Sequence, residues 1–223
     1  MSRVTHCNIS VLLIEDQPAE VEFIEESLSQ VKNCSFDLTH AERLGKGLEH
    51  LASHECDVLL LDLCLPDSNG YETFQKAHTA FPGLPIILIT NMDDEEQAER
   101  AVREGAQDYL IKRKMDSELL SRSIRYAIER QLSDEALRDS EERYALAVKG
   151  ANDGLWDWDL ATGKVYYSER WHTMLGLDEF ELDGTFEAWT KRIHPDDKEE
   201  FKVAMEAHLV SDSEQFSHEH RMR

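Results

Sequence analysis

Short apolar runs alternate with amphipathic stretches through the first 130 residues of the chain. Four runs are apolar throughout, as strands are when helices cover both faces of a sheet: 11–14, 58–61, 86–89 and 109–111. A weaker strand fits 34–39, and helical spacing fits 18–31, 41–53, 70–80, 94–104 and the residues from 116 onward. Five strand–helix repeats predict a doubly wound α/β domain with a five-stranded parallel sheet over 1–130.

The composition and hydrophobic pattern of the chain change after residue 111. Between Asp116 and Lys149 the chain has no proline or glycine and is rich in Glu, Arg, Leu and Ala, which predicts one long helix or two abutting ones. Leu137 and Tyr144 are a heptad apart, but acidic residues at 134 and 135 interrupt a clean repeat. We expect a helical linker over 131–149, with a coiled coil as an open alternative.

From residue 150 the pattern is typical of an α+β domain. Trp156, Trp158 and Leu160 alternate with polar residues, so they share one face of a strand. Trp156 and Trp158 are expected to pack in a core. The elements expected after them are a turn at 161–163, a strand at 165–167, a short helix capped by Ser168, a loop at 194–197, a helix ending near residue 209 and a strand at 214–222.

The overall charge restricts the partners. With 46 acidic against 24 basic residues the formal net charge is −22, which repels phosphate backbones and anionic membranes. We therefore expect neither a nucleic-acid nor a membrane partner. No apolar run approaches the ~20 residues of a membrane helix, and the N-terminus does not resemble a secretory signal. The four cysteines (Cys7, Cys34, Cys56 and Cys64) lack metal-ligand spacing and suit reduced thiols of a cytoplasmic protein.

Five polar residues follow or end the predicted strands. Glu15 and Asp16 come after the first strand, Asp62 after the third, Thr90 ends the fourth and Lys112 follows the fifth. Because the carboxyl ends of parallel strands form the ligand crevice of such a sheet, we expect these side chains to converge there.

This set of residues suits phosphoryl chemistry. Two carboxylates ~4 Å apart repel by ~4 kcal/mol at an effective dielectric of 20, so three of them need a cation. An all-oxygen site suits Mg²⁺, or Mn²⁺. The Asp62 carboxylate could then attack phosphorus, while Lys112 offers a positive charge and Thr90 a hydrogen bond to the phosphoryl oxygens.

The segments Ile14–Asp16, Asp62–Gly70, Ile89–Thr90 and Asp108–Lys112 resemble the receiver domains of response regulators, over roughly residues 8 to 130. The resemblance implies a flavodoxin-like fold whose phosphoacceptor, Asp62, is served by a sensor histidine kinase or a phosphotransfer protein. It assigns the remaining roles as follows: Glu15 and Asp16 as the acid pair at the metal, the backbone carbonyl of Cys64 as a further ligand, Thr90 as switch hydroxyl, Lys112 as phosphate contact and Tyr109 as switch aromatic. Asn91 departs from the small residue usual after the threonine, and Arg113 from the proline common after the lysine. Asp67 fits a turn without a catalytic role.

The segments Gly150–Leu160, Met174–Gly176 and Ile193–Asp197 resemble a PAS domain, here expected to be incomplete because two further strands would follow residue 223. Such domains bind haem, flavin or metabolites, or dimerise. No cysteine lies within 150–223, which excludes a flavin–thiol site there, and we interpret His172, His194 and His208 as surface or loop residues. Neither haem nor flavin is expected. His218 and His220 share one strand face, where a metal role is a minor alternative.

Together, these resemblances predict a phosphoacceptor receiver joined by a helix to a sensory or dimerising PAS module. The domain order resembles regulators with a cyclic-di-GMP synthase or phosphodiesterase output; a hybrid histidine kinase is the alternative. An aspartyl-phosphate phosphohydrolase would need a second acid at the position of Cys64, which argues against that class of enzyme. The presence of all five polar residues (Glu15, Asp16, Asp62, Thr90 and Lys112) argues against a receiver used only for binding. We expect no enzymatic activity beyond self-phosphorylation and slow dephosphorylation. A homodimer is expected through the fourth helix, fifth strand and fifth helix.

Overall fold

The computed structural model describes residues 7–32, 34–91, 94–177, 184–211 and 214–222. The chain divides into two compact units, 1–139 and 140–223, which are described separately. Among the described residues, no helix is long and apolar enough to cross a membrane.

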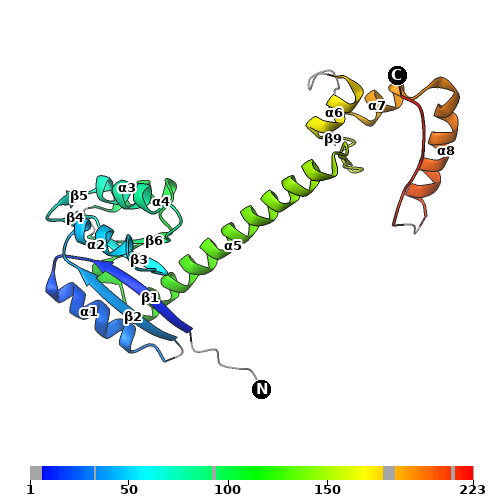
Figure 1. Cartoon of the computed structure of the whole chain (residues 1–223). Helices are drawn as coiled ribbons and strands as arrows, with labels where there is room; N and C mark the ends of the chain where they lie inside the picture. Colours follow the sequence, from blue (N-terminus) through cyan, green and yellow to red (C-terminus); the bar gives the residue numbers. More distant parts are fainter. Residues whose placement is uncertain (1–6, 33, 92–93, 178–183, 212–213, 223) are drawn as a thin grey trace. The chain divides into compact units, whose positions relative to one another are not determined.

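The first unit contains the predicted five-stranded parallel sheet, in the order β2-β1-β3-β6-β7 (Figure 1). Its strands are β1 (Cys7–Ile14), β2 (Cys34–Ala41), β3 (Val58–Asp62), β6 (Ile86–Thr90) and β7 (Asp108–Ile111). Its helices are α1 (Pro18–Ser29), α2 (Leu44–Leu51), α3 (Tyr71–Ala80), α4 (Glu95–Arg103) and the first part of α5 (Ser117–Ala151). The doubly wound fold expected from the sequence is confirmed.

Two apolar cores lie on the two faces of this sheet. Helices α1 and α5 supply Ile24, Leu28 and Leu120 to one core, and α2, α3 and α4 supply Leu44, Phe74 and others to the second core. Every residue of β3 and β6 is buried, because both faces of these central strands are covered. This rigid centre carries the polar residues that end the strands.

A short hairpin follows β3. It consists of β4 (Cys64–Leu65) and β5 (Ser68–Asn69). In its turn, the Asp67 carboxylate accepts hydrogen bonds from the backbone N–H groups of Leu44 (3.0 Å) and Gly45 (2.9 Å), at the start of α2. Asp67 is therefore a helix-capping residue supplied by a distant loop.

Helix α5 is continuous over 35 residues, which resolves the alternative of one or two helices. Leu120, Ile124 and Ala127 near its start are buried. Further along, large apolar side chains are about 60% exposed, among them Leu132 (60%), Leu137 (60%) and Leu146 (62%). This part of the helix therefore offers apolar surface that the described chain does not cover.

The second unit begins with an antiparallel pair, β8 (Trp156–Trp158) and β9 (Val165–Tyr167). Helices α6 (Glu169–Leu175), α7 (Phe186–Arg192) and α8 (Lys198–Leu209) follow, with a 3₁₀ turn, η3 (Pro195–Asp197), before α8. Ser168 caps α6 as expected, since its side chain accepts a hydrogen bond from the Trp171 N–H. Trp156 and Trp158 pack against the buried core of this unit, as predicted.

Two expectations for this unit are wrong. Residues 214–222 form no strand: a single bridge joins Met222 to Ile193, because no strand of the described chain lies along their edge to form a ladder. His172 is not a surface residue, since it is only 6% exposed beside Tyr167 and Trp171. The short helix α6 buries two consecutive positions, Trp171 and His172, which spacing alone did not reveal.

Candidate functional site

The parallel sheet brings the predicted polar residues to one edge. Glu15 and Asp16 directly follow β1, and Asp62 is the last residue of β3. Thr90 is the last residue of β6 and pairs with Ile111 of β7, so Lys112 lies one position further along than Thr90. The register of the strands, which the apolar runs fix, thus places all five residues at the carboxyl end of the sheet.

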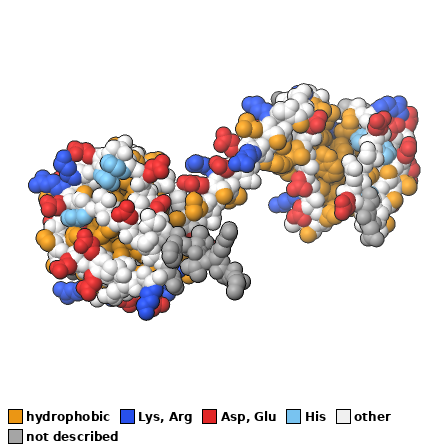
Figure 2. All heavy atoms as spheres, turned by 60° about the horizontal axis from the view of Figure 1, so that its bottom comes forward, with side chains coloured by type: hydrophobic (Ala, Val, Ile, Leu, Met, Phe, Trp, Pro, Cys, Tyr) orange, Lys and Arg blue, Asp and Glu red, His pale blue; other side chains and the backbone are white. Residues whose placement is uncertain are grey.

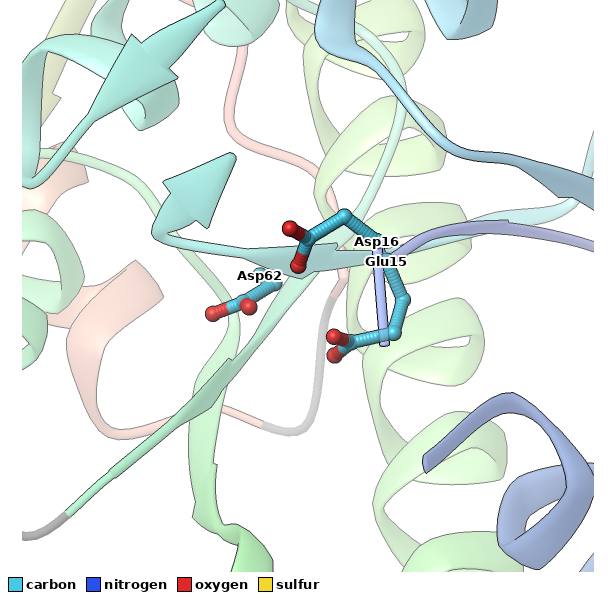
Figure 3. Close-up of side chains that lie close together, drawn as sticks. All are labelled: Glu15, Asp16 and Asp62. Atoms are coloured by element: carbon cyan, nitrogen blue, oxygen red, sulfur yellow. The ribbon is translucent and has the colours of Figure 1, made fainter. Parts of the chain in front are cut away.

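Three carboxylates meet at this edge. One oxygen each from Glu15, Asp16 and Asp62 lies within 4.8 Å of the others. Figure 3 shows Asp16 and Glu15 reaching from the end of β1 toward Asp62 on β3. Glu15 and Asp62 are buried and Asp16 is half-buried. The structure therefore brings together the acids that the sequence predicted as metal ligands.

Lys112 lies against two of these acids. Its Nζ is 2.7 Å from Glu15 Oε2 and 3.0 Å from Asp62 Oδ2, and all three side chains are at most 3% exposed. Burial alone would lower the pKa of Lys112, but the hydrogen bonds and charges of Glu15 and Asp62 outweigh it and raise the pKa. Lys112 thus lies against Asp62, the residue beside which it was expected, whereas the bridge to Glu15 was not predicted.

The site contains more acidic side chains than its one lysine can pair with. Burial raises the pKa of both Glu15 and Asp62, and their contacts with Lys112 oppose that rise without cancelling it. Asp16 Oδ1 is buried without a hydrogen-bond partner in the described chain. Leaving such an atom unsatisfied costs ~1–3 kcal/mol. Three acids against one lysine, with an oxygen lacking a donor, form a set that a divalent cation would complete.

The loop after Asp62 is held in place by backbone hydrogen bonds. Cys64 N–H donates to Asp62 Oδ1 at 3.2 Å. The carbonyl of Leu63 accepts from the Gly70 N–H at 2.7 Å and from the Thr73 hydroxyl at 3.0 Å. These bonds fix the backbone around Cys64, the residue whose carbonyl was expected to contribute a ligand.

The thiol of Cys64 faces a carboxylate that sequence reasoning missed. Its Sγ donates to Asp94 Oδ2 at 3.4 Å. Burial, followed by the effects of Asp94, raises the pKa of the thiol to about 11. The side chain is therefore a neutral thiol at pH 7 and offers no acid–base chemistry beside Asp62.

The two predicted switch residues occupy different environments. Thr90 is buried, and its hydroxyl donates to the backbone carbonyl of Asn91 at 3.2 Å. Tyr109 is half-buried on β7, and its hydroxyl donates to Glu95 Oε1 of α4 at 3.2 Å. Burial, helped by Glu95, raises the pKa of Tyr109. Tyr109 therefore forms its hydrogen bond with α4 and not with the acidic site, and no pattern in the sequence indicates Glu95 as its partner.

The two departures noted in the sequence both lie next to the site. Asn91 is exposed directly after Thr90. Arg113 is the exposed middle residue of a 3₁₀ turn, η2 (Lys112–Lys114). The loop after Lys112 therefore forms a 3₁₀ turn although Arg113 stands where proline was expected from the resemblance.

Comparison with known proteins identifies both halves of the chain. The family model of the response regulator receiver domain matches residues 11–124, and that of the PAS fold matches residues 164–223. The probable transcriptional regulatory protein SilR of Salmonella typhimurium is 30% identical over 114 residues, which are 51% of this chain and 49% of SilR. The cell cycle response regulator CtrA of Brucella ovis is 34% identical over 112 residues, 50% of this chain and 47% of CtrA. The chain thus spans about half the length of these curated relatives.

Solved structures give the same result. The signal receiver domain of an HD domain-containing protein from Pseudomonas fluorescens Pf-5 is 27% identical, covers 61% of this chain and 97% of its own, and superposes with a TM-score of 0.52. NtrX from Brucella abortus, at 19% identity, covers 70% of this chain and 32% of its own with a TM-score of 0.54, which shows the shared fold alone.

Two expectations do not agree with these findings. The curated relatives are named as transcriptional regulators, which does not fit the expectation that the protein has no nucleic-acid partner. That expectation rested on the net charge of these 223 residues, which describes only their own surface. None of these comparisons supports a cyclic-di-GMP output.

Proposed function

The chain belongs to the family of response regulator receiver domains, and from this we propose that Asp62 accepts a phosphoryl group from a sensor histidine kinase or a phosphotransfer protein in the cytoplasm. The observation that carries the proposal is the convergence on Asp62 of two further carboxylates and the Lys112 ammonium at the end of the sheet. The receiver would take part in two-component signalling, and its only chemistry would be its own phosphorylation and slow dephosphorylation.

The proposed reaction is a displacement at phosphorus. A carboxylate oxygen of Asp62 forms the new P–O bond, the bond from phosphorus to the donor breaks, and its electron pair leaves with the donor atom. Lys112, now paired with Asp62 Oδ2, is placed to neutralise an incoming phosphoryl oxygen. The Cys64 N–H keeps the other oxygen of Asp62 oriented. The buried Thr90 hydroxyl would turn from the Asn91 carbonyl to donate to the phosphoryl group.

The residues present fit a Mg²⁺ ion, or Mn²⁺. The carboxylates of Glu15, Asp16 and Asp62 and the backbone carbonyl of Cys64 would hold it, an all-oxygen set of the kind these cations prefer. A bound Mg²⁺ supplies positive charge that stabilises the phosphoryl oxygens in the transition state. Two observations support this assignment: Asp16 Oδ1 has no hydrogen-bond partner among the described residues, and the acids outnumber the one lysine.

The alternative of an aspartyl-phosphate phosphohydrolase is disfavoured by Cys64. Turnover on a substrate would need an acid–base group two residues after Asp62. The Cys64 thiol, with its pKa raised to about 11, cannot act as that base near neutral pH. A hybrid histidine kinase remains the alternative to a separate regulator.

For transmission we propose that the phosphoryl group biases a homodimer face on α4, β7 and α5. Phosphorylation adds up to about two negative charges at Asp62. The Thr90 side chain would move toward the phosphoryl group. Tyr109 would then turn into the space that Thr90 leaves and lose its hydrogen bond to Glu95. The PAS unit would act as a sensory or dimerising module without haem or flavin.

The test is incubation of the chain with acetyl phosphate and Mg²⁺, followed by intact mass. We expect one acid-labile phosphate per chain, lost in Asp62→Asn and lost without Mg²⁺. Asp67→Asn, which alters an acid that only caps α2, is the matched control and should still take up the phosphate. An Asp62→Asn chain that is phosphorylated as well as the wild type would refute the assignment.

A further inference from the structure

In the second unit, the Nδ1 atoms of two histidines lie close together. His218 Nδ1 and His220 Nδ1 are 3.4 Å apart. Both side chains are partly exposed and lie beside Phe201, whose ring centroid is 5.5 Å from that of His218 and 5.0 Å from that of His220. Figure 2 shows histidine side chains of this unit at the surface next to hydrophobic ones. An ion from solution can therefore reach such a pair.

The segment that carries the two histidines is held at its end. The Arg221 carbonyl accepts from the His194 N–H at 2.8 Å. The Arg221 guanidinium donates to Asp197 from Nη2 at 2.6 Å and from Nε at 2.9 Å. At the other end Phe216 packs edge-on against Phe201, with ring centroids 6.1 Å apart. The rings of His218 and His220 are thus placed by contacts on both sides of them, although the segment forms no strand.

The distance between the nitrogens fits one metal ion better than it fits a direct bond. A nitrogen–nitrogen distance of 3.4 Å exceeds the ~2.7–3.2 Å of ordinary N–H hydrogen bonds. If each nitrogen lay about 2.05 Å from a shared ion, this distance would give an N–metal–N angle of about 110°, which is tetrahedral. A square-planar or octahedral ion, with angles near 90°, would need a separation of about 2.9 Å.

We propose that His218 and His220 form a bidentate site for a tetrahedral divalent transition-metal ion of the Zn²⁺ type, with water in its other positions. The site is separate from the all-oxygen cluster around Asp62, which suits a harder cation.

The chain contains a matched control pair, His50 and His54. These are also close neighbours, but their rings stack face to face with centroids 4.2 Å apart and an interplanar angle of 5°. His54 Nδ1 is within 3.2 Å of the His50 carbonyl, so its ring is engaged elsewhere. Stacked rings do not aim two nitrogens at one point, and this pair should not chelate an ion.

Tryptophan fluorescence can isolate the site in the whole 223-residue chain. All four tryptophans lie in the second unit, and excess Mg²⁺ competes with Co²⁺ for the acidic site of the first unit. The Trp189 ring is 5.8 Å from that of His220. We expect Co²⁺, added in excess Mg²⁺, to quench the fluorescence saturably with one equivalent, and Zn²⁺ to reverse the quenching. His218→Gln and His220→Gln should each weaken this binding roughly ten-fold or more, and His50→Gln should leave it unchanged.

A second measurement needs no substitution and so cannot be confused by misfolding. Zn²⁺ should protect His218 and His220 from modification by diethyl pyrocarbonate, read by peptide mass, while His50 and His54 react as before. Absence of saturable quenching in the wild type, equal quenching in folded Gln variants, or equal modification of His218 and His220 with and without Zn²⁺ would each overturn the proposal.

Discussion

Replacing Lys112 with Met should reveal how far this lysine compensates the buried acids of the metal-free protein. Its Nζ lies 2.7 Å from Glu15 and 3.0 Å from Asp62, and none of the three side chains is more than 3% exposed. Water therefore screens the pair little. Removing one partner of a buried ion pair costs ~3–5 kcal/mol, because the other charge is left uncompensated, and here two charges are left. We expect a loss of stability of the first unit of about that size in EDTA.

The matched control is Lys76→Met. Lys76 forms an ion pair of 2.9 Å with Glu72 on α3, but the two side chains are 45% and 66% exposed. Exposed pairs of this kind contribute ~0.3–0.5 kcal/mol. The two variants remove the same charge, so the difference between them measures the effect of burial and not of net charge.

The assay is urea unfolding followed by circular dichroism, with and without Mg²⁺. Tryptophan fluorescence, which arises from the second unit alone, should not change in either variant. Mg²⁺ at a concentration of 100 times its Kd stabilises the folded state that binds it by ~2.7 kcal/mol. It should therefore restore much of the stability that Lys112→Met loses. If Lys112→Met is as stable as Lys76→Met in EDTA, the lysine does not compensate buried carboxylates and this reasoning is refuted.

Four further outcomes are expected. Since burial raises the pKa of Glu15 and Asp62, both carboxyl groups bind protons more readily in the folded state. The stability that they contribute is present at low pH and is lost as the pH rises through the raised pKa values. Metal-free urea midpoints should therefore fall as the pH rises above the ordinary pKa of these groups, and fall less in Asp62→Asn. Protonation of the same acids should weaken Mg²⁺ binding as the pH falls, which a Mg²⁺ titration at several pH values measures. Tyr109→Phe removes the 3.2 Å hydrogen bond to the Glu95 carboxylate and should destabilise the metal-free chain by ~1.5–3 kcal/mol, measured by urea unfolding. The purified chain should show no visible absorption band, and a stoichiometric band lost on deleting 150–223 would contradict the absence of haem and flavin.

The sheet and the location of the site were predictable because both follow from local pattern. Runs such as 58–61 and 86–89 are apolar on every position, and only a strand covered on both faces buries them completely. Once the strands are parallel, the residues at their ends must meet at one edge. Glu15, Asp62 and Lys112 were therefore predicted together although 97 positions separate Glu15 from Lys112.

What could not be predicted depends on tertiary contacts. Helix α2 begins at Leu44 and not near residue 41, because β2 continues to Ala41 in register with Ile14 and because Asp67 caps the helix from another loop. Side-chain partners such as Glu95 for Tyr109 depend on rotamers and helix placement. Residues 214–222 have the composition of a strand, but a strand exists only beside a partner, and the described chain provides a single bridge there.

The environment of Tyr109 limits how strongly phosphorylation can act on the proposed dimer face. Turning the ring inward gives up its hydrogen bond to the Glu95 carboxylate, worth ~1.5–3 kcal/mol for a charged partner. A shift from 1:99 to 99:1 would need about 5.5 kcal/mol of differential binding. One new hydrogen bond from Thr90 to a phosphoryl oxygen supplies an amount similar to what Tyr109 gives up, so a partial shift is the expected response. The exposed apolar residues of α5, such as Leu137 and Leu146, are present in either state. Any association that they drive adds a constitutive part to dimerisation, on which the receiver exerts a bias and not full control.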